Sequence, residues 1–77
     1  MAIKNKLNFL IKEQGKARAD IAKALNISEG ALSNKFNRDS YSAEDLIKIA
    51  DCLGVSLALI GGRQQIIFDL DDIRENS

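Results

Sequence analysis

The fold is decided by residues 18–36, which read RADIAKALNISEGALSNKF. An apolar stripe at helical spacing predicts a first short helix, and it consists of Ile21, Ala22 and Leu25. Asn26 follows directly and tolerates the left-handed conformation that ends helices. Ser28 is a good N-cap, so a second helix is expected to begin at Glu29. These residues therefore predict two short helices joined by a tight turn.

The second predicted helix has two contrasting faces. Leu32 and Phe36 lie four residues apart and share an apolar face. The opposite face carries mostly small or amide-bearing side chains, namely Glu29, Gly30, Ser33, Asn34 and Lys35. Because such a face can approach base edges closely, this spacing is typical of a DNA-binding helix-turn-helix whose second helix enters the major groove. The alternative is an antiparallel pair of helices whose polar face meets only water.

Two runs of sequence carry a family resemblance, RADIAKALNISEGALSNKFN and SAEDLIKIADCLGVS. Their distinctive features are Ala22 in the first motif helix, the turn Asn26-Ile27-Ser28, the pair Leu32-Ser33, and the run Leu46-Ile47-Lys48-Ile49-Ala50 ending in Leu53-Gly54-Val55-Ser56. Over residues 3–58 the chain resembles the lambda-repressor-like family, the Cro/CI or XRE type of bacterial and phage regulators. The resemblance implies a mainly α, compact four-helix DNA-binding domain that binds operator DNA, usually as a homodimer, and carries no catalysis. We therefore expect a sequence-specific transcriptional regulator of phage or mobile-element repressor type.

Candidate contacts to double-stranded DNA lie on the second helix and beside it. The predicted base-reading residues are Glu29, Ser33 and Asn34. Asn reads adenine by a two-point contact, Ser can donate or accept, and Glu can accept from a cytosine amino group. The predicted contacts to the DNA backbone are Arg18, Ser28, Lys35, Asn37 and Arg38. Arg18 stands where the resemblance implies a glutamine that binds a phosphate, and arginine would reach a phosphate with a full charge.

Two positions of the second helix leave alternatives open. Gly30 occupies an early position from which members of the family often read a base, but glycine has no side chain to read with. Either the helix backbone approaches the DNA closely there, or specificity moves to Glu29, Ser33 and Asn34. Glu29 in turn is either a base reader or a first-turn acid that favours the helix dipole.

The net charge of zero hides an uneven distribution. Residues 1–38 contain eight Lys or Arg and three acidic residues, a net charge of +5. Residues 39–77 contain three Lys or Arg and eight acidic residues, a net charge of −5. A basic half can lie against phosphates, whereas chance segregation on a solvated surface is the plain alternative. The acidic half indicates a second function class, an antitoxin-like or other protein-interaction module in which this half holds a protein partner.

The composition excludes several function classes. With one Cys and no His, neither a disulfide framework nor a zinc site can form within one chain, and His-based catalysis is excluded. Since no glycine-rich phosphate loop is visible either, we expect no enzyme activity, metal or cofactor. Cys52 is expected in the core, with a redox sensor as the alternative. No apolar run can span a bilayer and no signal peptide is visible, so the cytoplasm of a bacterial or phage-infected cell is the simplest location.

A helix over residues 2–14 is expected to precede the motif and to end at Gly15. Its apolar stripe consists of Ile3, Leu7, Leu10 and Ile11. Phe9 does not fit this stripe and is expected at the edge of the core, with an exposed patch for a partner as the alternative. Ala17 then stands where the resemblance implies a polar capping residue, and its absence is expected to cost about 1 kcal/mol. Asp20 is expected to compensate in part through the helix dipole.

A helix over residues 43–53 is expected to follow the motif and to end at Gly54. Ser42 caps it, with Asp45 three residues on in an approximate capping box. The residues that it is expected to bury are Leu46, Ile49, Ala50 and Leu53. Tyr41, just before the cap, stands where a subgroup of the resembled family has an aromatic residue that closes the core, so the resemblance implies the same role here.

The C-terminal residues 57–70 predict a β-hairpin with a two-residue turn at Gly61-Gly62. A short fifth helix over residues 56–60, followed by a strand, is the alternative. One face of the second strand is predicted from the period of two and consists of Ile66, Phe68 and Leu70.

The second apolar run of the hairpin is longer than the first. We predict that its overhang, residues 68–70, pairs or packs with a second copy of the chain, which makes Ile66, Phe68 and Leu70 the predicted dimerisation residues. The predicted organisation is therefore a helix-turn-helix DNA-binding domain over residues 1–56, a hairpin over 57–70 and a solvated acidic tail over 71–77.

Overall fold

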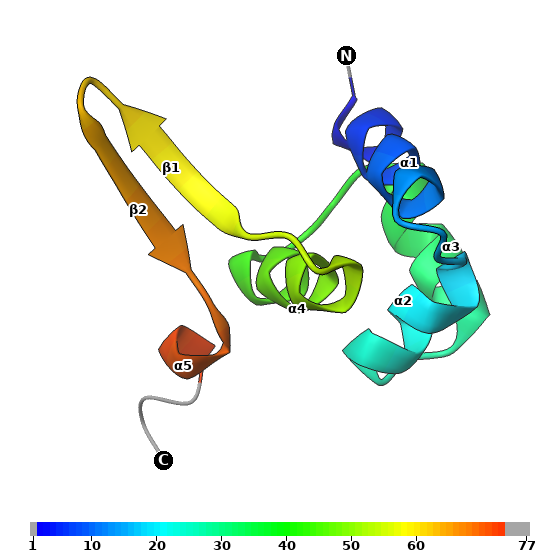
Figure 1. Ribbon diagram of the computed structural model, residues 1–77. Helices are drawn as coiled ribbons and strands as arrows, with labels where there is room; N and C mark the ends of the chain where they lie inside the picture. The colour runs from blue at the N-terminus through cyan, green and yellow to red at the C-terminus, as the bar shows by residue number, and fades with distance from the viewer. Residues whose placement is uncertain (1, 74–77) are drawn as a thin grey trace.

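The computed structural model describes residues 2–73, which form a helical body with a hairpin projecting from it (Figure 1). The elements in chain order are α1 (Ile3–Glu13), α2 (Arg18–Leu25), α3 (Glu29–Arg38), α4 (Ala43–Leu53), β1 (Leu57–Gly61), β2 (Gln64–Phe68) and α5 (Leu70–Ile73). The predicted fold class, four main helices with a C-terminal β-hairpin, is confirmed.

The turn between α2 and α3 forms as the sequence predicts. Asn26 adopts the left-handed conformation, with φ of 59°, and α2 ends there. The Ser28 hydroxyl then accepts a hydrogen bond from the Ala31 N–H at 3.0 Å, so α3 begins at Glu29. Asn26 therefore fixes the end of α2, and Ser28 fixes the start of α3.

The predicted capping box at the start of α4 is present. The Ser42 hydroxyl accepts from the Asp45 N–H, and the Asp45 carboxylate accepts from the Ser42 N–H, both at 3.0 Å. At the start of α2 only half of this arrangement exists, because alanine has no acceptor. There the Asp20 carboxylate accepts from the Ala17 N–H at 2.9 Å, so Asp20 compensates by a hydrogen bond as well as through the dipole.

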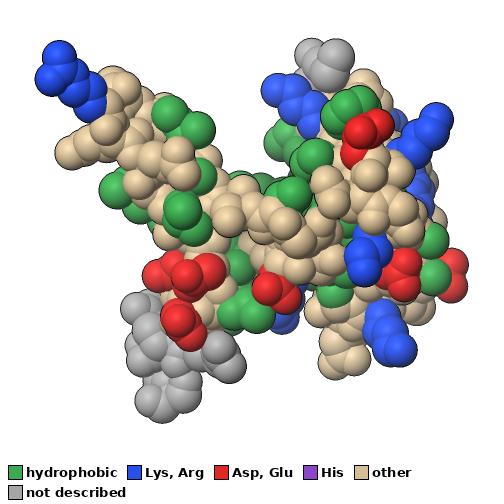
Figure 2. Space-filling model, in the orientation of Figure 1, with side chains coloured by type: hydrophobic (Ala, Val, Ile, Leu, Met, Phe, Trp, Pro, Cys, Tyr) green, Lys and Arg blue, Asp and Glu red, His purple; other side chains and the backbone are tan. Residues whose placement is uncertain are grey.

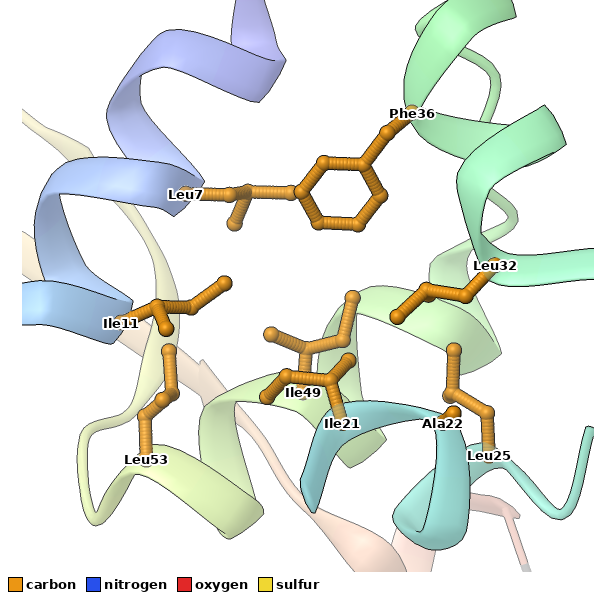
Figure 3. Packing of buried hydrophobic residues seen from close by; sticks show 9 residues of the cluster. All are labelled: Leu7, Ile11, Ile21, Ala22, Leu25, Leu32, Phe36, Ile49 and Leu53. Carbon is orange, nitrogen blue, oxygen red and sulfur yellow. The ribbon is translucent and has the colours of Figure 1, made fainter. Parts of the chain in front are cut away.

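The core lies where α1, α2, α3 and α4 meet (Figure 3). Its buried side chains point toward a common centre and are Leu7, Ile11, Ile21, Ala22, Leu25, Leu32, Phe36, Ile49 and Leu53. Tyr41 is partly buried against this cluster, and its ring meets that of Phe36 edge to face, with centroids 5.7 Å apart. Tyr41 therefore closes the core as predicted.

Four predictions about burial differ from the structure, the first being Ile3, a member of the predicted apolar stripe of α1 that is 47% exposed. Phe9 is 62% exposed and does not lie at the edge of the core. It is two residues from both Leu7 and Ile11, which places it on the opposite side of α1. In α4, Ile47 is buried and Leu46 is only partly buried. Cys52 is likewise partly buried rather than enclosed, and its thiol lies 3.7 Å from the Asp20 carbonyl oxygen.

The hairpin is confirmed, but its turn is one residue later than predicted. Gly61 pairs with Gln64 and belongs to β1, so Gly62 and Arg63 form the turn. Gly62 supplies the positive φ, 55°, that a two-residue turn needs at its first position. Strand pairing in β1 therefore extends one residue further than predicted, to Gly61.

The predicted overhang of the second strand is absent. β1 and β2 are both five residues long, and Phe68 lies opposite Leu57 at the base of the hairpin. Leu70 is not a strand residue, because it begins the four-residue helix α5. The first part of the predicted solvated tail is therefore helical up to Ile73, and its remainder, residues 74–77, lies outside the described residues.

The start of α1 is capped from a distant part of the chain. Ala2, at the N-cap position, offers no side-chain acceptor. The Asp39 carboxylate, just after α3, instead accepts from the Ile3 N–H at 3.0 Å and from the Lys4 N–H at 2.8 Å. Desolvation opposes the ionised form of Asp39, but these two donors, together with the Tyr41 hydroxyl and the charge of Lys4, outweigh it, so the pKa of Asp39 lies below its ordinary value of 3.8.

The Asp39→Asn variant tests this cap. Asn also tolerates the left-handed conformation of Asp39, so the substitution changes the charge more than the backbone. A carboxylate with a lowered pKa stabilises the fold above the pKa of the unfolded chain, and this contribution is lost as the pH falls through the folded pKa. We expect the thermal midpoint of the variant to lie below that of the wild type at pH 7 and to approach it at pH 3.

Thermal unfolding followed by circular dichroism at the two pH values measures this effect. Asp51→Asn, at an exposed position of α4, is the matched control because it removes a carboxylate that does not cap a helix. An equal difference between wild type and Asp39→Asn at both pH values would show that the charge of Asp39 does not stabilise α1.

Candidate nucleic-acid interface

One face of α3 is left uncovered by the rest of the chain. Leu32 and Phe36 turn inward, and each is 1% exposed. The outer side chains recur at the spacing of a single helical face, and all except the half-buried Ser33 are exposed. This surface, called here the α3 stripe, consists of Glu29, Gly30, Ser33, Asn34, Asn37 and Arg38.

The α3 stripe brings together all three predicted base readers and two of the predicted backbone contacts. Glu29 and Ser33 lie one turn apart, and Asn34 is exposed near the middle of the helix. Asn37 and Arg38 follow at the C-terminal end of the same face. A short amide, a hydroxyl and a carboxylate therefore share one open helical face with a terminal guanidinium, the mixture of donors and acceptors that base edges and phosphates present.

Lys35 points away from the α3 stripe. Its Nζ atom lies 2.9 Å from the Asp45 carboxylate, and the two side chains are 34% and 16% exposed. Desolvation opposes the charge of Asp45, but the Ser42 N–H and Lys35 outweigh it and lower the pKa of Asp45. Lys35 therefore ties α3 to the start of α4, and the sequence alone did not show this ion pair because its members belong to different helices.

Arg18 is held at the junction of α1, α2 and α3. Its guanidinium carbon lies 4.4 Å from the centroid of the Phe36 ring, a cation–π contact. One guanidinium nitrogen donates to the Asn8 side-chain oxygen at 3.2 Å. The guanidinium has five N–H donors, so this single hydrogen bond leaves most of them available. Sequence reasoning missed the role of Asn8, whose only signal was an amide beside the apolar stripe of α1.

Gly30 has no structural reason to be glycine. A Cβ atom added there would meet only the Ser28 hydroxyl oxygen, at the ordinary contact distance of 3.9 Å. The residue also lacks the positive φ that favours glycine at Gly62. Within a helix, glycine is less favourable than alanine by roughly 0.5–1 kcal/mol. Neither packing nor backbone conformation inside the domain therefore explains this residue.

Ser28 combines a structural and a potential binding role. Its oxygen accepts from the Ala31 N–H, yet the residue is exposed. A serine hydroxyl that accepts a hydrogen bond retains its own O–H donor. The cap of α3 is thus also a donor at the helix N-terminus, where anions are favoured.

The charged side chains are unevenly placed on the molecule. Figure 2 shows acidic side chains grouped around the base of the hairpin and a basic side chain at its tip, with further Lys and Arg side chains on the helical body. Within residues 2–73, no three His, Cys, Asp or Glu side chains lie together as metal ligands would. No helix among these residues has the length and apolar character needed to cross a membrane.

The fold and the open face of α3 define a DNA-binding helix-turn-helix domain, a class without catalytic activity. The family model of the bacteriophage CI repressor helix-turn-helix domain matches residues 11–66, which is most of the chain. The chain belongs to this family. Comparison with curated proteins gives no match, and comparison with solved structures gives none either.

Asp45→Ala tests how much the contact between α3 and α4 contributes to the fold. The variant removes half of the capping box and the partner of Lys35. We expect the free energy of unfolding to fall by about 1–2 kcal/mol, chiefly from the lost cap. Urea denaturation measures this change.

The matched control for this substitution is Glu44→Ala, in the same first turn. Glu44 makes an ion pair with Lys48 within α4 and is 55% exposed at its side chain, so its loss should cost less than about 0.5 kcal/mol. Equal effects of the two substitutions would mean that Asp45 contributes no more than an ordinary surface acid.

Proposed function

We propose that this chain is a phage-type repressor that binds operator DNA sequence-specifically as a homodimer, with α3 in the major groove. The observation that carries this proposal is the α3 stripe, an open helical face of small and flat polar side chains on a helix fixed by its buried residues. The match to the phage CI repressor helix-turn-helix family supports the same function. A location in the cytoplasm of a bacterial or phage-infected cell accords with this proposal.

Base reading is assigned to the centre and start of the α3 stripe. Asn34 is exposed near the middle of α3, and its amide can make a two-point contact to adenine. Ser33 and Glu29 lie on the same face and are assigned to neighbouring bases. The choice for Glu29 between base reading and dipole stabilisation is left to mutation.

Phosphate contacts are assigned to the flanks of the α3 stripe. Arg38 and Asn37 follow at its C-terminal end. At the other end, Ser28 supplies a hydroxyl donor, and Arg18 supplies a guanidinium already oriented by Asn8 and Phe36. A side chain held in place before binding loses less conformational entropy on binding. Lys35 is assigned the smallest share of phosphate binding, because Asp45 already neutralises its charge.

Gly30 is assigned to the closest approach between α3 and DNA. Nothing inside the domain requires glycine there, and a missing side chain lets a helix backbone come nearer to a ligand. The position lies on the α3 stripe one turn before Asn34. A shorter distance between the α3 backbone at Gly30 and the DNA would bring the side chains of the next helical turn closer to the base edges.

The test of base reading compares Asn34→Ala with Lys35→Ala. A duplex is first selected from a random-sequence pool by binding to the wild type, and affinities are then measured by fluorescence anisotropy at two salt concentrations. Asn34→Ala is expected to weaken binding by about tenfold or more and to relax preference at one base pair, because a bidentate contact is lost. Lys35→Ala, next to it in the chain, is the control and should change affinity by much less.

The outcome that contradicts the reading role of Asn34 is an equal loss for both variants with unchanged base preference. Failure of the wild type to enrich any site from the random pool would contradict sequence-specific binding as a whole. A salt-dependent affinity without enrichment would mean that phosphate contacts alone hold the DNA.

Gly30→Ala separates the stability of α3 from its approach to DNA. We expect the free energy of unfolding to rise by about 0.4–1 kcal/mol, since alanine fits the space and lowers the entropy of the unfolded chain. We expect affinity for the selected duplex to fall in the same variant. Urea denaturation and anisotropy measure the two effects, and unchanged or tighter DNA binding by the stabilised variant would exclude close approach at Gly30.

The predicted dimer would read two half-sites about one helical turn, roughly 34 Å, apart. Of the three residues predicted to dimerise, Ile66 is 55% exposed, whereas Phe68 and Leu70 are partly buried near α4. Ile66 is therefore the residue of this group most open to a second copy. The alternative to a homodimer is a protein partner that binds the acidic half of the chain. Measurement of the dimer in the following section bears on this alternative.

A further inference from the structure

The hairpin carries the largest exposed apolar side chains of the described part of the chain apart from those of α1. The exposed fractions are 67% for Leu59, 75% for Ile60, 55% for Ile66 and 49% for Ile67. Leu59 lies opposite Ile66 in the register, so these two share one face of the sheet, and Ile60 and Ile67 lie on the other. Two isolated strands are marginally stable in water, so this hairpin has apolar surface to cover on both of its sides.

The edges of this hairpin carry no protection against pairing. Among residues 2–73 each of its two strands has one neighbour, and the other edge of each strand is unpaired there. Natural edge strands are commonly blocked by charged side chains, by Pro or by a bulge. Residues 57–68 contain no Pro, and their one charged residue, Arg63, stands in the turn rather than in a strand.

The charges around the hairpin lie at its two ends. Arg63 is at the tip, and no ion pair joins it to another described residue. The base is followed at once by Asp69, Asp71 and Asp72. The five paired rows of residues between them correspond to about 17 Å at 3.4 Å per residue. Figure 2 shows this separation, with a basic side chain at the far end of the hairpin and acidic side chains at its base.

We propose that two copies of this chain associate hairpin to hairpin in antiparallel orientation, with Arg63 of each copy against the acidic segment 69–72 of the other. Two hairpins aligned in the same direction would place arginine beside arginine and acids beside acids, which is repulsive. The reversed direction turns both contacts into attractions, while the apolar side chains between the two ends cover one another. The proposal deepens the dimeric function proposed above and rests on it.

A second copy is the occupant that this surface favours. A two-fold interface must be self-complementary, because the same patch supplies both partners. The hairpin meets this condition by itself, since its basic tip and acidic base are spaced to match their own reversed image. A foreign basic partner would use the acidic base but would be repelled by Arg63.

The test is a charge swap in the full chain without DNA. Sedimentation equilibrium gives the dimer dissociation constant for the wild type, Arg63→Glu, Asp69→Arg and the double variant. We expect Arg63→Glu to weaken the dimer by about tenfold or more, because it places two like-charge contacts in the interface. Asp69→Arg should weaken it less, because Asp71 and Asp72 keep the acidic segment net negative. The double variant restores an opposite-charge pair between positions 63 and 69 of the two copies, while Asp71 and Asp72 stay acidic, so its dissociation constant should fall below that of Arg63→Glu.

Two further variants complete the design. Lys12→Glu makes the same charge change as Arg63→Glu on an exposed position of α1, and the dimer should keep its wild-type dissociation constant. Ile60→Thr keeps a β-branched side chain and reduces apolar surface, so it should weaken the dimer without removing the strand signal in circular dichroism. The single variants should also approach the wild type in high salt, where the charge contacts are screened.

The outcomes separate this proposal from the DNA-binding one. A double variant no tighter than Arg63→Glu, or a wild type that stays monomeric at all concentrations, would overturn the antiparallel hairpin dimer. The sedimentation measurements contain no DNA and therefore test the dimer alone. If they support the dimer but the wild type enriches no operator from the random pool, the dimer stands and the proposed regulator is contradicted. A monomer that enriches a single half-site would do the reverse.

Discussion

The burial of the Phe36 ring is the constraint on which both the scaffold and the candidate DNA-binding surface depend. The ring lies in the core with 1% of its surface exposed, meets Tyr41 edge to face and stacks under the guanidinium of Arg18. A helix pinned at one buried residue can no longer rotate about its own axis. The direction in which Asn34 and Arg38 point is therefore a consequence of apolar packing on the other side of α3.

The same packing gives polar residues of similar chemistry different roles. Lys35 and Arg38 are both basic and only three residues apart, yet Lys35 meets Asp45 whereas Arg38 lies on the α3 stripe. The partly buried pair of Lys35 with Asp45 links α3 to α4, and the exposed Arg38 leaves a charge for a ligand. Charge counts along the chain therefore overstate the positive surface available to DNA, and the placement of each partner decides how much remains.

The four main helices and their boundaries could be predicted from sequence because neighbouring residues determine them, whereas α5 was not predicted. Asn26, Ser28 and the Ser42–Asp45 pair act on backbone groups within a few positions, so their effects are visible in the chain itself. The hairpin turn was misplaced by one residue because either glycine of the pair can supply the positive φ at the first turn position. Local rules constrain the kind of turn more strongly than its register.

Contacts between distant parts of the chain could not be predicted in the same way. The Arg18–Asn8 hydrogen bond and the Lys35–Asp45 pair join residues ten positions apart that belong to different helices. Their partners become visible only when the helices are placed in space. Prediction of the candidate DNA-binding face needed no such contacts, because helical periodicity alone groups its residues. The family match and the open face of α3 both accord with DNA binding.

The capping of α1 by Asp39 also bears on how the chain is made. Asp39 lies 36 positions after Ile3 and 35 positions after Lys4, the two residues whose N–H groups it accepts from. During synthesis α1 leaves the ribosome first, yet the carboxylate that completes its first turn emerges only after all of α3. The cap of α1 therefore becomes available only after all of α3 has been made.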